Sequence, residues 1–252
     1  MWTRWQSVVM ATHVGARLAV LIDADNASAQ HLERMLVEIA KFGTASVRRA
    51  YGDWTTTNLS QWKEQLLKHS VQPVQQFAYT TGKNATDSAL IIDAMDLLHS
   101  GTVDGFCLVS SDSDFTRLAA RIREQGLLAY GFGKRNTPKP FVAACNTFIY
   151  VENLEGVKAT PTPVAAPKLA RDAKLDGLLA EAVEAASADD GWAGLGAVGS
   201  NLSRLASDFD SRTWGFTKLT DLMTAHPGYV VQSRPTGEGK PPATYVKPKA
   251  RK

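Results

Sequence analysis

Residues 106–132, FCLVSSDSDFTRLAARIREQGLLAYGF, contain the pattern that decides the fold. Apolar runs at Phe106–Val109 and Leu127–Phe132 predict two buried strands. The segment between them, Asp114–Gln125, has the pattern of a helix. A strand, a helix and a second strand in succession are typical of two strands that pair in parallel within one sheet. This stretch therefore predicts an α/β fold.

The same alternation extends from Arg17 to Asn153. Helical spacing is clearest in residues 32–40, where Leu32, Met35, Leu36, Ile39 and Ala40 recur every three to four positions. Strict alternation predicts a parallel sheet that is covered by helices on both faces. The other strands are expected at Leu18–Ile22, Ser46–Tyr51, Val71–Phe77 and Phe148–Val151, and the other helices at His31–Phe42, Leu59–His69, Asp87–His99 and Pro140–Ala144.

A second, smaller domain follows a stretch that is typical of a linker. Residues 156–168 (GVKATPTPVAAPK) contain three prolines and no aromatic residue, which predicts an extended, flexible connection. Beyond them, three helices and a terminal hairpin predict a winged helix-turn-helix domain. The helices are expected at Lys174–Ala186, Leu195–Leu205 and Trp214–Ala225, and the strands at Gly228–Gln232 and Ala243–Val246. The expected organisation is a disordered leader (1–16), a first domain (17–155), the linker (156–168), the winged-helix domain (169–247) and a basic tail (248–252).

The composition is that of a globular protein and excludes several other classes. Of the 252 residues, 44% are hydrophobic and 21% are charged, and the formal net charge is +3. No apolar stretch reaches the roughly 18 residues that suggest a membrane span, so we expect a soluble, cytoplasmic protein. Cys107 and Cys145 lie in apolar surroundings without the spacing of zinc ligands, so we expect two buried thiols and no zinc finger.

Acidic residues follow two of the expected strands, where a charged residue is least expected. Asp23 ends the first strand, Asp112 and Asp114 follow the fourth, and Asp87 opens a helix. Ligands of open α/β sheets bind at the carboxyl ends of the strands. If the first and fourth strands are neighbours, Asp23 and Asp112 therefore meet in one crevice, and Asp87 can reach it. Clustered carboxylates without His or Cys suit Mg²⁺ or Mn²⁺, which prefer oxygen ligands.

Each of these acids also has a purely structural interpretation. Asp114 could cap its own helix, and Asp87 could interact with the positive end of the helix that it opens. The combination of acids at strand ends, rather than any one of them, favours a functional site. Asp93 follows Asp87 by about 240° around the helix, so we expect for it a solvent-facing or supporting role.

Three ordered segments, LIDADN (21–26), GKNATDSALIIDAMD (82–96) and LVSSDSDFTRLA (108–119), resemble the NYN domain in the LabA-like branch of the PIN-like nucleases. The resemblance covers Arg17 to about Glu152 and implies a PIN-like fold with a metal-dependent nuclease site. It implies that Asn26 orients the substrate or a metal-bound water, and that Lys83 faces a phosphate. It assigns one or two Mg²⁺ or Mn²⁺ ions to the carboxylates of Asp23, Asp87, Asp112 and Asp114.

The segment GWAGLGAVGSNLSRLASDFDSRTWGFTKLTDLM (191–223) resembles the OST-HTH (LOTUS) domain, a small winged helix. The resemblance implies RNA binding or, in some members, contact with a protein partner. Trp192 and Phe216 are expected in the core of so small a domain. Candidates for phosphate contact are Arg204, Arg212, Lys218, Arg234 and Lys240.

These features together predict a metal-dependent endoribonuclease that hydrolyses RNA phosphodiester bonds with an Asp cluster. Arg48 and Arg49 lie at the end of the second strand, where their charge could guide single-stranded RNA. Tyr51 and Trp54 could add stacking there, or they could simply close the edge of the core.

Two other functions are compatible with the same sequence. Asp23-Ala24-Asp25 after an apolar strand imitates the acid pair of haloacid-dehalogenase-like phosphohydrolases, although the lysine and late acid pair of that class are missing. In the other alternative, the protein is a non-catalytic RNA-binding scaffold whose acids are vestigial. The RNA substrate and the oligomeric state stay open.

Overall fold

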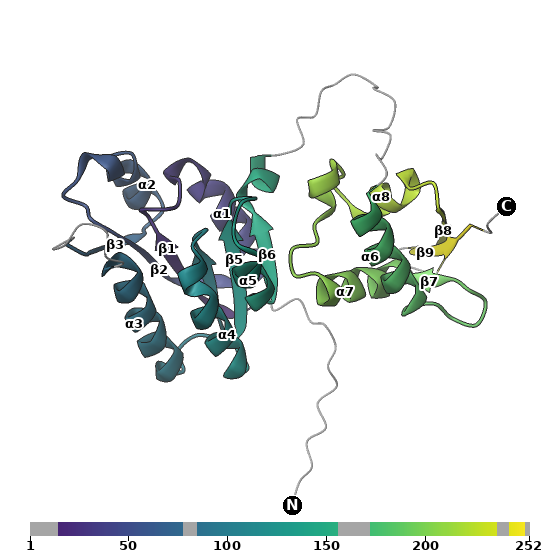
Figure 1. The fold of residues 1–252 in the computed structure, drawn as a ribbon, viewed down its shortest axis with the longest axis horizontal. Coiled ribbons are helices and arrows are strands. Elements are labelled where there is room, and N and C mark those ends of the chain that lie inside the picture. The colour runs from purple at the N-terminus through teal and green to yellow at the C-terminus, as the bar shows by residue number, and fades with distance from the viewer. Residues whose placement is uncertain (1–14, 78–84, 156–171, 236–241, 250–252) are drawn as a thin grey trace, which may run out of the picture.

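The computed structural model describes residues 15–77, 85–155, 172–235 and 242–249. Figure 1 shows two domains, an α/β domain followed by a smaller one of helices and short strands. The expected linker (156–168) and Lys83 lie outside the described residues, as do most of the expected leader and basic tail. In the part of the chain that the structure describes, every helix is too short or too polar to cross a bilayer.

The first domain is built on a six-stranded sheet with the strand order β3-β2-β1-β4-β5-β6, in which every neighbouring pair is parallel. The α/β prediction is therefore confirmed. The strands are β1 (Arg17–Asp23), β2 (Thr44–Gly52), β3 (Gln72–Gln75), β4 (Gly105–Val109), β5 (Leu128–Gly133) and β6 (Thr147–Tyr150). The helices are α1 (Leu32–Ile39), α2 (Trp62–Lys68), α3 (Ala85–Ser100), α4 (Thr116–Glu124) and α5 (Lys139–Ala144), with 3₁₀ turns η1 (Ala29–His31), η2 (Thr57–Leu59), η3 (Ser113–Phe115) and η4 (Val151–Glu155).

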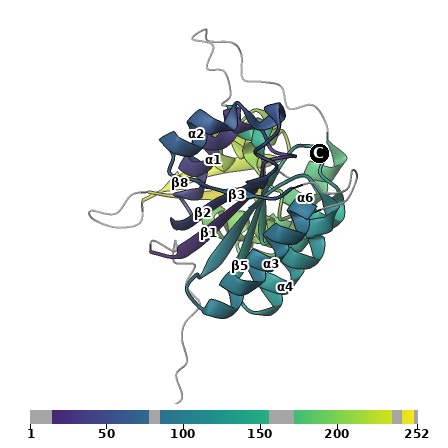
Figure 2. The same ribbon diagram turned by 90° about the vertical axis from the view of Figure 1, so that its left-hand side faces the viewer.

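Helices cover both faces of this sheet, with α1 and α2 on one side and α3 and α4 on the other (Figure 2). Leu32, Met35 and Ile39 of α1 pack into the core on the first side, as their spacing predicts. A second core lies on the opposite face, where α3 and α4 pack against the same strands. Because the central strands are enclosed from both sides, β4 is buried along its entire length.

The chain reverses its direction across the sheet between β1 and β4. From β1 the chain adds β2 and β3 on one side, whereas β4, β5 and β6 follow on the other. Ile22 at the end of β1 is paired with Val109 at the end of β4. This is the position at which open parallel sheets form a crevice for ligands, and three of the predicted acids, Asp23, Asp112 and Asp114, lie at the ends of these two strands.

The described residues of the second domain form three α-helices and a three-stranded antiparallel sheet with the order β7-β9-β8. The helix expected at Trp214–Ala225 is shorter, because Gly215 takes a left-handed conformation (φ 84°) that ends the turn before it. The expectation of Trp192 in the core is wrong, since its ring is half-buried and lies against Arg234. Phe216 is buried as expected. The elements are α6 (Ala173–Glu184), β7 (Ala193–Gly194), α7 (Leu195–Leu205), η5 (Ser211–Trp214), α8 (Leu219–Ala225), β8 (Tyr229–Arg234) and β9 (Ala243–Pro248).

The segment between α7 and α8 joins the second domain to the outer strand of the first. The carbonyl of Ser207 accepts a hydrogen bond from the backbone N–H of Phe148 on β6 at 2.8 Å. The Ser207 hydroxyl donates to the carbonyl of Val142 on α5, also at 2.8 Å. The second domain thereby satisfies backbone groups next to the sheet edge that would otherwise need water or another strand.

Side chains reinforce this contact between the domains. The Arg212 guanidinium donates to both carboxylate oxygens of Glu38 on α1, at 3.1 and 3.0 Å, and also pairs with Asp210. Glu38 is only 8% exposed, so its charge depends on Arg212 and on Lys41, whose ammonium group donates to it at 2.8 Å. Two further polar pairs cross the interface, Tyr150 with Asp208 and Asn153 with Thr213.

Candidate active site

Asp23 is the innermost acid of the site. Its side chain ends β1 and is completely buried. One carboxylate oxygen accepts hydrogen bonds from the Asn26 amide (2.8 Å) and the Ser110 hydroxyl (2.7 Å), and the other accepts from the backbone N–H of Asn26 (3.3 Å). Burial raises the pKa of Asp23, and these hydrogen bonds oppose the rise by stabilising the carboxylate. The network therefore holds a buried carboxylate in one orientation.

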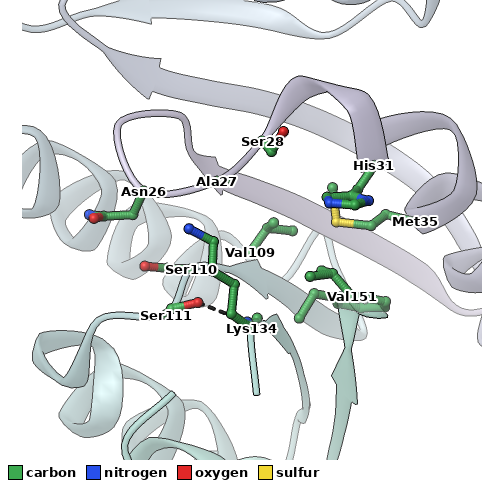
Figure 3. Close-up of a pocket in the computed structure, with 12 residues that line it drawn as sticks. Asn26, Ala27, Ser28, His31, Met35, Val109, Ser110, Ser111, Lys134 and Val151 are labelled. Carbon is green, nitrogen blue, oxygen red and sulfur yellow. Dashed lines mark hydrogen bonds between the residues drawn. The ribbon is translucent and has the colours of Figure 1, made fainter. Parts of the chain in front are cut away.

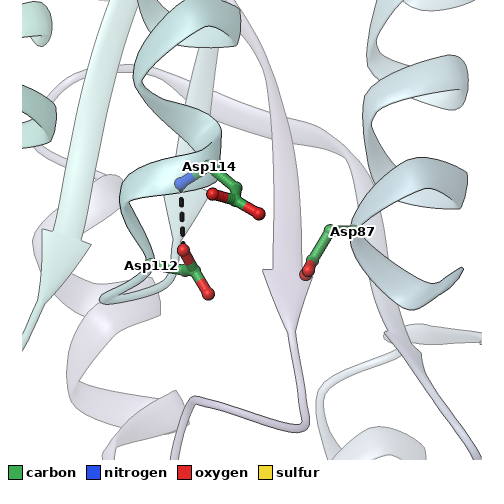
Figure 4. A group of neighbouring side chains, drawn as sticks. All are labelled: Asp87, Asp112 and Asp114. Carbon is green, nitrogen blue, oxygen red and sulfur yellow. Dashed lines mark hydrogen bonds between the residues drawn. The ribbon is translucent and has the colours of Figure 1, made fainter. Parts of the chain in front are cut away.

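Asp112 and Asp114 follow β4 and form the turn that leads into α4. The Asp112 carboxylate caps η3 by accepting a hydrogen bond from the backbone N–H of Asp114 at 2.9 Å. The backbone N–H of Asp112 donates to the Ser110 hydroxyl at 3.1 Å, which links this turn to Asp23. Asp112 therefore caps η3, and its carboxylate still lies beside those of Asp114 and Asp87 (Figure 4).

Asp87 completes the group from the first turn of α3. One carboxylate oxygen from each of Asp87, Asp112 and Asp114 can be chosen so that all three atoms lie within 4.8 Å of one another. Figure 4 shows Asp87 facing the other two across the end of the sheet. A set of oxygen donors at this spacing suits a hard divalent cation. The geometry therefore brings together three of the four predicted acids, with Asp23 behind them.

The closeness of these acids has an electrostatic consequence for Asp87. Burial and the charges of Asp23, Asp112, Asp114 and Asp25, in that order, raise the pKa of Asp87 to about 6. Like charges that are held together in this way repel one another unless a cation or a proton compensates them. The metal-free site consequently reduces the stability of the folded domain at neutral pH.

We expect Asp87→Asn to stabilise the metal-free protein by roughly 1 to 2 kcal/mol at about pH 7.5, less than the full pKa shift implies because water screens part of the repulsion. The pKa of Asp87 is higher in the folded protein than in the unfolded chain. The free energy of unfolding of the native protein therefore falls as the pH rises from the unfolded-state pKa of Asp87 through about 6. The gain from Asn should therefore grow between about pH 4 and pH 6 and stay constant above.

Urea unfolding in the presence of a chelator, followed at several pH values, measures this gain. Asp96→Asn is the matched control, because Asp96 is an exposed acid on the same helix. An equal stability change in both variants, or a gain that does not depend on pH, would show that Asp87 is not under electrostatic strain.

Two polar groups that support the site were not singled out for that purpose from the sequence. Ser110 is 3% exposed and connects Asp23 to the turn at Asp112. Thr86 donates its hydroxyl to Asp25 at 2.9 Å and thereby ties the start of α3 to the loop after β1. The available signal was a polar residue one or two positions before an acid, Thr86 before Asp87 and Ser110 before Asp112, and such a pattern is too common to be distinctive.

The arginines expected to guide RNA have other partners in the structure. Arg48 donates to the carbonyls of Ala45 and His69. Arg49 pairs with Asp93 on α3, which also accepts a hydrogen bond from the Tyr51 hydroxyl. Asp93 thus has the supporting role, because it fixes the helix that carries Asp87 to β2.

The aromatic residues of this region differ in their exposure. Tyr51 is completely buried, so its ring belongs to the core and cannot stack on RNA. Trp54 is half-buried, and its indole N–H donates to the carbonyl of Val74 at 3.0 Å. In the second domain, Arg204 near the end of α7 and Lys218 at the start of α8 are exposed and available for phosphate contact.

A small pocket is lined by Asn26 and Ser110, the two residues that hold Asp23, and by Lys134 (Figure 3). Figure 3 shows the side chain of Lys134 extending toward the loop that carries Asn26. The backbone N–H of Lys134 donates to the Ser111 hydroxyl at 2.9 Å, so the lysine is anchored close to the acidic turn. Lys134 is a cation near the site that the sequence did not mark.

Comparison with known families and structures extends these observations. A model of the NYN domain matches residues 17–154, and a model of the OST-HTH/LOTUS domain matches residues 170–241. A crystal structure of a protein of unknown function from Vibrio parahaemolyticus shares 18% identity, with a TM-score of 0.46 over 55% of this chain and 94% of that one. A solution structure of an uncharacterized protein from Nitrosomonas europaea shares 36% identity, with a TM-score of 0.31 over 38% of this chain and 91% of that one. No curated protein matches the sequence significantly.

Proposed function

Because the chain belongs to the NYN domain family over residues 17–154 and carries an OST-HTH/LOTUS domain at residues 170–241, we propose that it is a metal-dependent endoribonuclease whose second domain holds RNA. NYN domains are members of the PIN-like nucleases. The observation that carries the proposal is the convergence of Asp87, Asp112 and Asp114, with carboxylate oxygens within 4.8 Å of one another.

The residues present fit a divalent cation. All the candidate donors are carboxylate oxygens, which Mg²⁺ and Mn²⁺ prefer, and the raised pKa of Asp87 reflects negative charge that a cation would compensate. Asp87, Asp112 and Asp114 would hold the ion, with Asp23 as a further ligand or as the charge behind them. When bound, the ion supplies Lewis-acid polarisation of the phosphodiester and stabilises the charge on the leaving oxygen.

The side chains of the protein have positioning roles in this reaction. Asn26 and Ser110 hold Asp23 in one orientation, and the backbone of the turn holds Asp112. Asn26, which is exposed, is in addition the candidate for contact with substrate, and Lys134 and Lys83 are the candidates for phosphate contact. Water is the nucleophile, so hydrolysis forms no covalent intermediate with the protein. By analogy with the family, the products carry a 5′-phosphate and a 3′-hydroxyl.

The geometry argues against the phosphohydrolase alternative. A haloacid-dehalogenase-like enzyme needs the first acid of its pair as an accessible nucleophile. Asp23 is completely buried, and both of its oxygens accept hydrogen bonds from Asn26 or Ser110. Such a carboxylate is suited to supporting a charged site rather than to attacking a phosphorus atom. A non-catalytic RNA-binding scaffold would not require the acids to meet.

Removal of divalent metal tests the proposal. With EDTA we expect cleavage of a labelled RNA to fall to background, and Mn²⁺ or Mg²⁺ in excess should restore it. A small phosphomonoester, tested with the same preparation, should not be hydrolysed. Cleavage that persists without metal, or turnover of the phosphomonoester in place of RNA, would refute the proposed chemistry.

A further inference from the structure

The three-stranded sheet of the second domain has one face in the core and one face directed outward. Ala193, Tyr229 and Val246 are buried in the core with α6, α7 and α8. Neighbouring residues of a strand point to opposite faces, so Val230 and Tyr245 belong to the outer face. Val230 is accordingly 43% exposed. The sheet lies at the end of this domain that is remote from the first domain, so the first domain does not cover it (Figure 1).

Two aromatic rings and an arginine form a stack on this outer face. The guanidinium carbon of Arg234 lies 4.6 Å from the ring centroid of Trp192 and 4.6 Å from that of Tyr245. Both rings are half-buried, so each is ordered by its contact with Arg234 while part of it stays accessible. Ordered aromatic faces beside a cation are the elements with which proteins bind unpaired bases.

This face carries two cationic side chains, Arg234 and Lys247. Lys247 donates its ammonium group to the backbone carbonyl of Asp190 at 2.7 Å, a contact that leaves its charge uncompensated. The Asp190 carboxylate lies 3.8 Å from Arg234, a distance typical of a weak ion pair at the surface. Arg234 and Lys247 are therefore the two cations among the side chains that contact one another on this face. We call Trp192, Arg234, Tyr245 and Lys247 the wing platform.

We propose that the wing platform binds single-stranded RNA, with bases stacked on Trp192 and Tyr245 and phosphates held by Arg234 and Lys247. This inference rests on the proposed function, because it names the surface with which the second domain holds its substrate. Single strands are favoured over duplexes, since bases in a helix are already stacked on their neighbours and cannot lie on a protein ring. The cations Arg234 and Lys247 favour a polyanion over an apolar protein surface.

The test uses the full chain with Asp112→Asn, so that bound RNA is not cleaved. Fluorescence anisotropy with labelled oligouridine measures affinity. Trp192→Leu and Tyr245→Leu should each weaken binding by about tenfold, the usual scale of one lost base stack. Arg234→Lys keeps the charge but loses the planar group between the rings, and should weaken binding several-fold. The matched control is Lys174→Ala, an exposed cation on α6, which should change affinity by less than about twofold.

Several outcomes would contradict the platform. If the Asp112→Asn parent binds oligouridine and the platform variants bind it equally well, the platform is wrong and the proposed function stands. An equal loss for a duplex of the same length would also refute it, because stacking would not be involved. Absence of any RNA binding by the parent would remove the proposed function itself. If thermal unfolding shows that the Trp192→Leu variant is not folded, the affinities of Tyr245→Leu and Arg234→Lys for oligouridine decide whether the platform binds RNA.

Discussion

Asp112→Asn is expected to lower the rate of RNA cleavage by at least about 1000-fold, because it removes one charged ligand from a site that depends on a divalent ion. The amide retains the oxygen that caps η3, so the turn should keep its shape. RNA affinity should be unchanged or higher, because the substitution also removes a negative charge that repels phosphates. Single-turnover cleavage and anisotropy with the same RNA measure the two effects separately.

Asp96→Asn is the control for this experiment, since it removes an equal charge from an exposed position on α3. It should retain nearly all activity. Cleavage that survives Asp112→Asn would show that the acids do not form the catalytic centre. A parallel loss in both variants would point to overall charge rather than to the site.

The second large effect concerns the contact between the domains. Arg212→Ala should destabilise the docked arrangement by about 2 kcal/mol, because nearly buried Glu38 loses its bidentate partner and keeps only the exposed Lys41. Arg212 is itself partly exposed, so the effect should fall below that of a completely buried pair. The docked arrangement should then be less populated, and small-angle X-ray scattering should record a larger average radius of gyration.

A double-mutant cycle with Glu38→Gln isolates this interaction from other effects of the substitution. Arg121→Ala is the matched control, because Arg121 and Glu124 form an exposed ion pair on α4, for which we expect less than about 0.5 kcal/mol. Unchanged scattering and no coupling between Arg212 and Glu38 would show that the domains do not depend on this pair. The linker would then determine their separation, as its composition predicts.

The parts of the fold that depend on local pattern could be predicted from the sequence. The apolar runs of β1 and β4 and the helical spacing of α1 appear in the structure where expected, because burial on both faces demands continuous apolar strands. The third helix of the second domain begins at Leu219, whereas the sequence predicts a start at Trp214. A single glycine conformation at Gly215 ended the preceding turn, and residue type alone does not specify that conformation.

Trp192 and Arg49 show where local reasoning fails. A large aromatic residue in a small domain is expected in the core, but strand register places Trp192 beside Arg234 on the outer face. Arg49 near a strand end suggested contact with RNA, whereas the packing of α3 supplies Asp93 as its partner. In both cases the deciding residue is distant in the sequence.

The sequence by itself determined the α/β class, the two families and the acids that terminate strands, because these follow from periodicity and from short ordered motifs. Only the tertiary structure decided that β1 and β4 are neighbours, that Asp87, Asp112 and Asp114 meet, and that Ser207 and Arg212 dock the second domain on β6 and α1. The physical reason is that electrostatic repulsion, ion pairing and hydrogen bonding depend on distances of a few ångströms between residues that the chain alone keeps far apart.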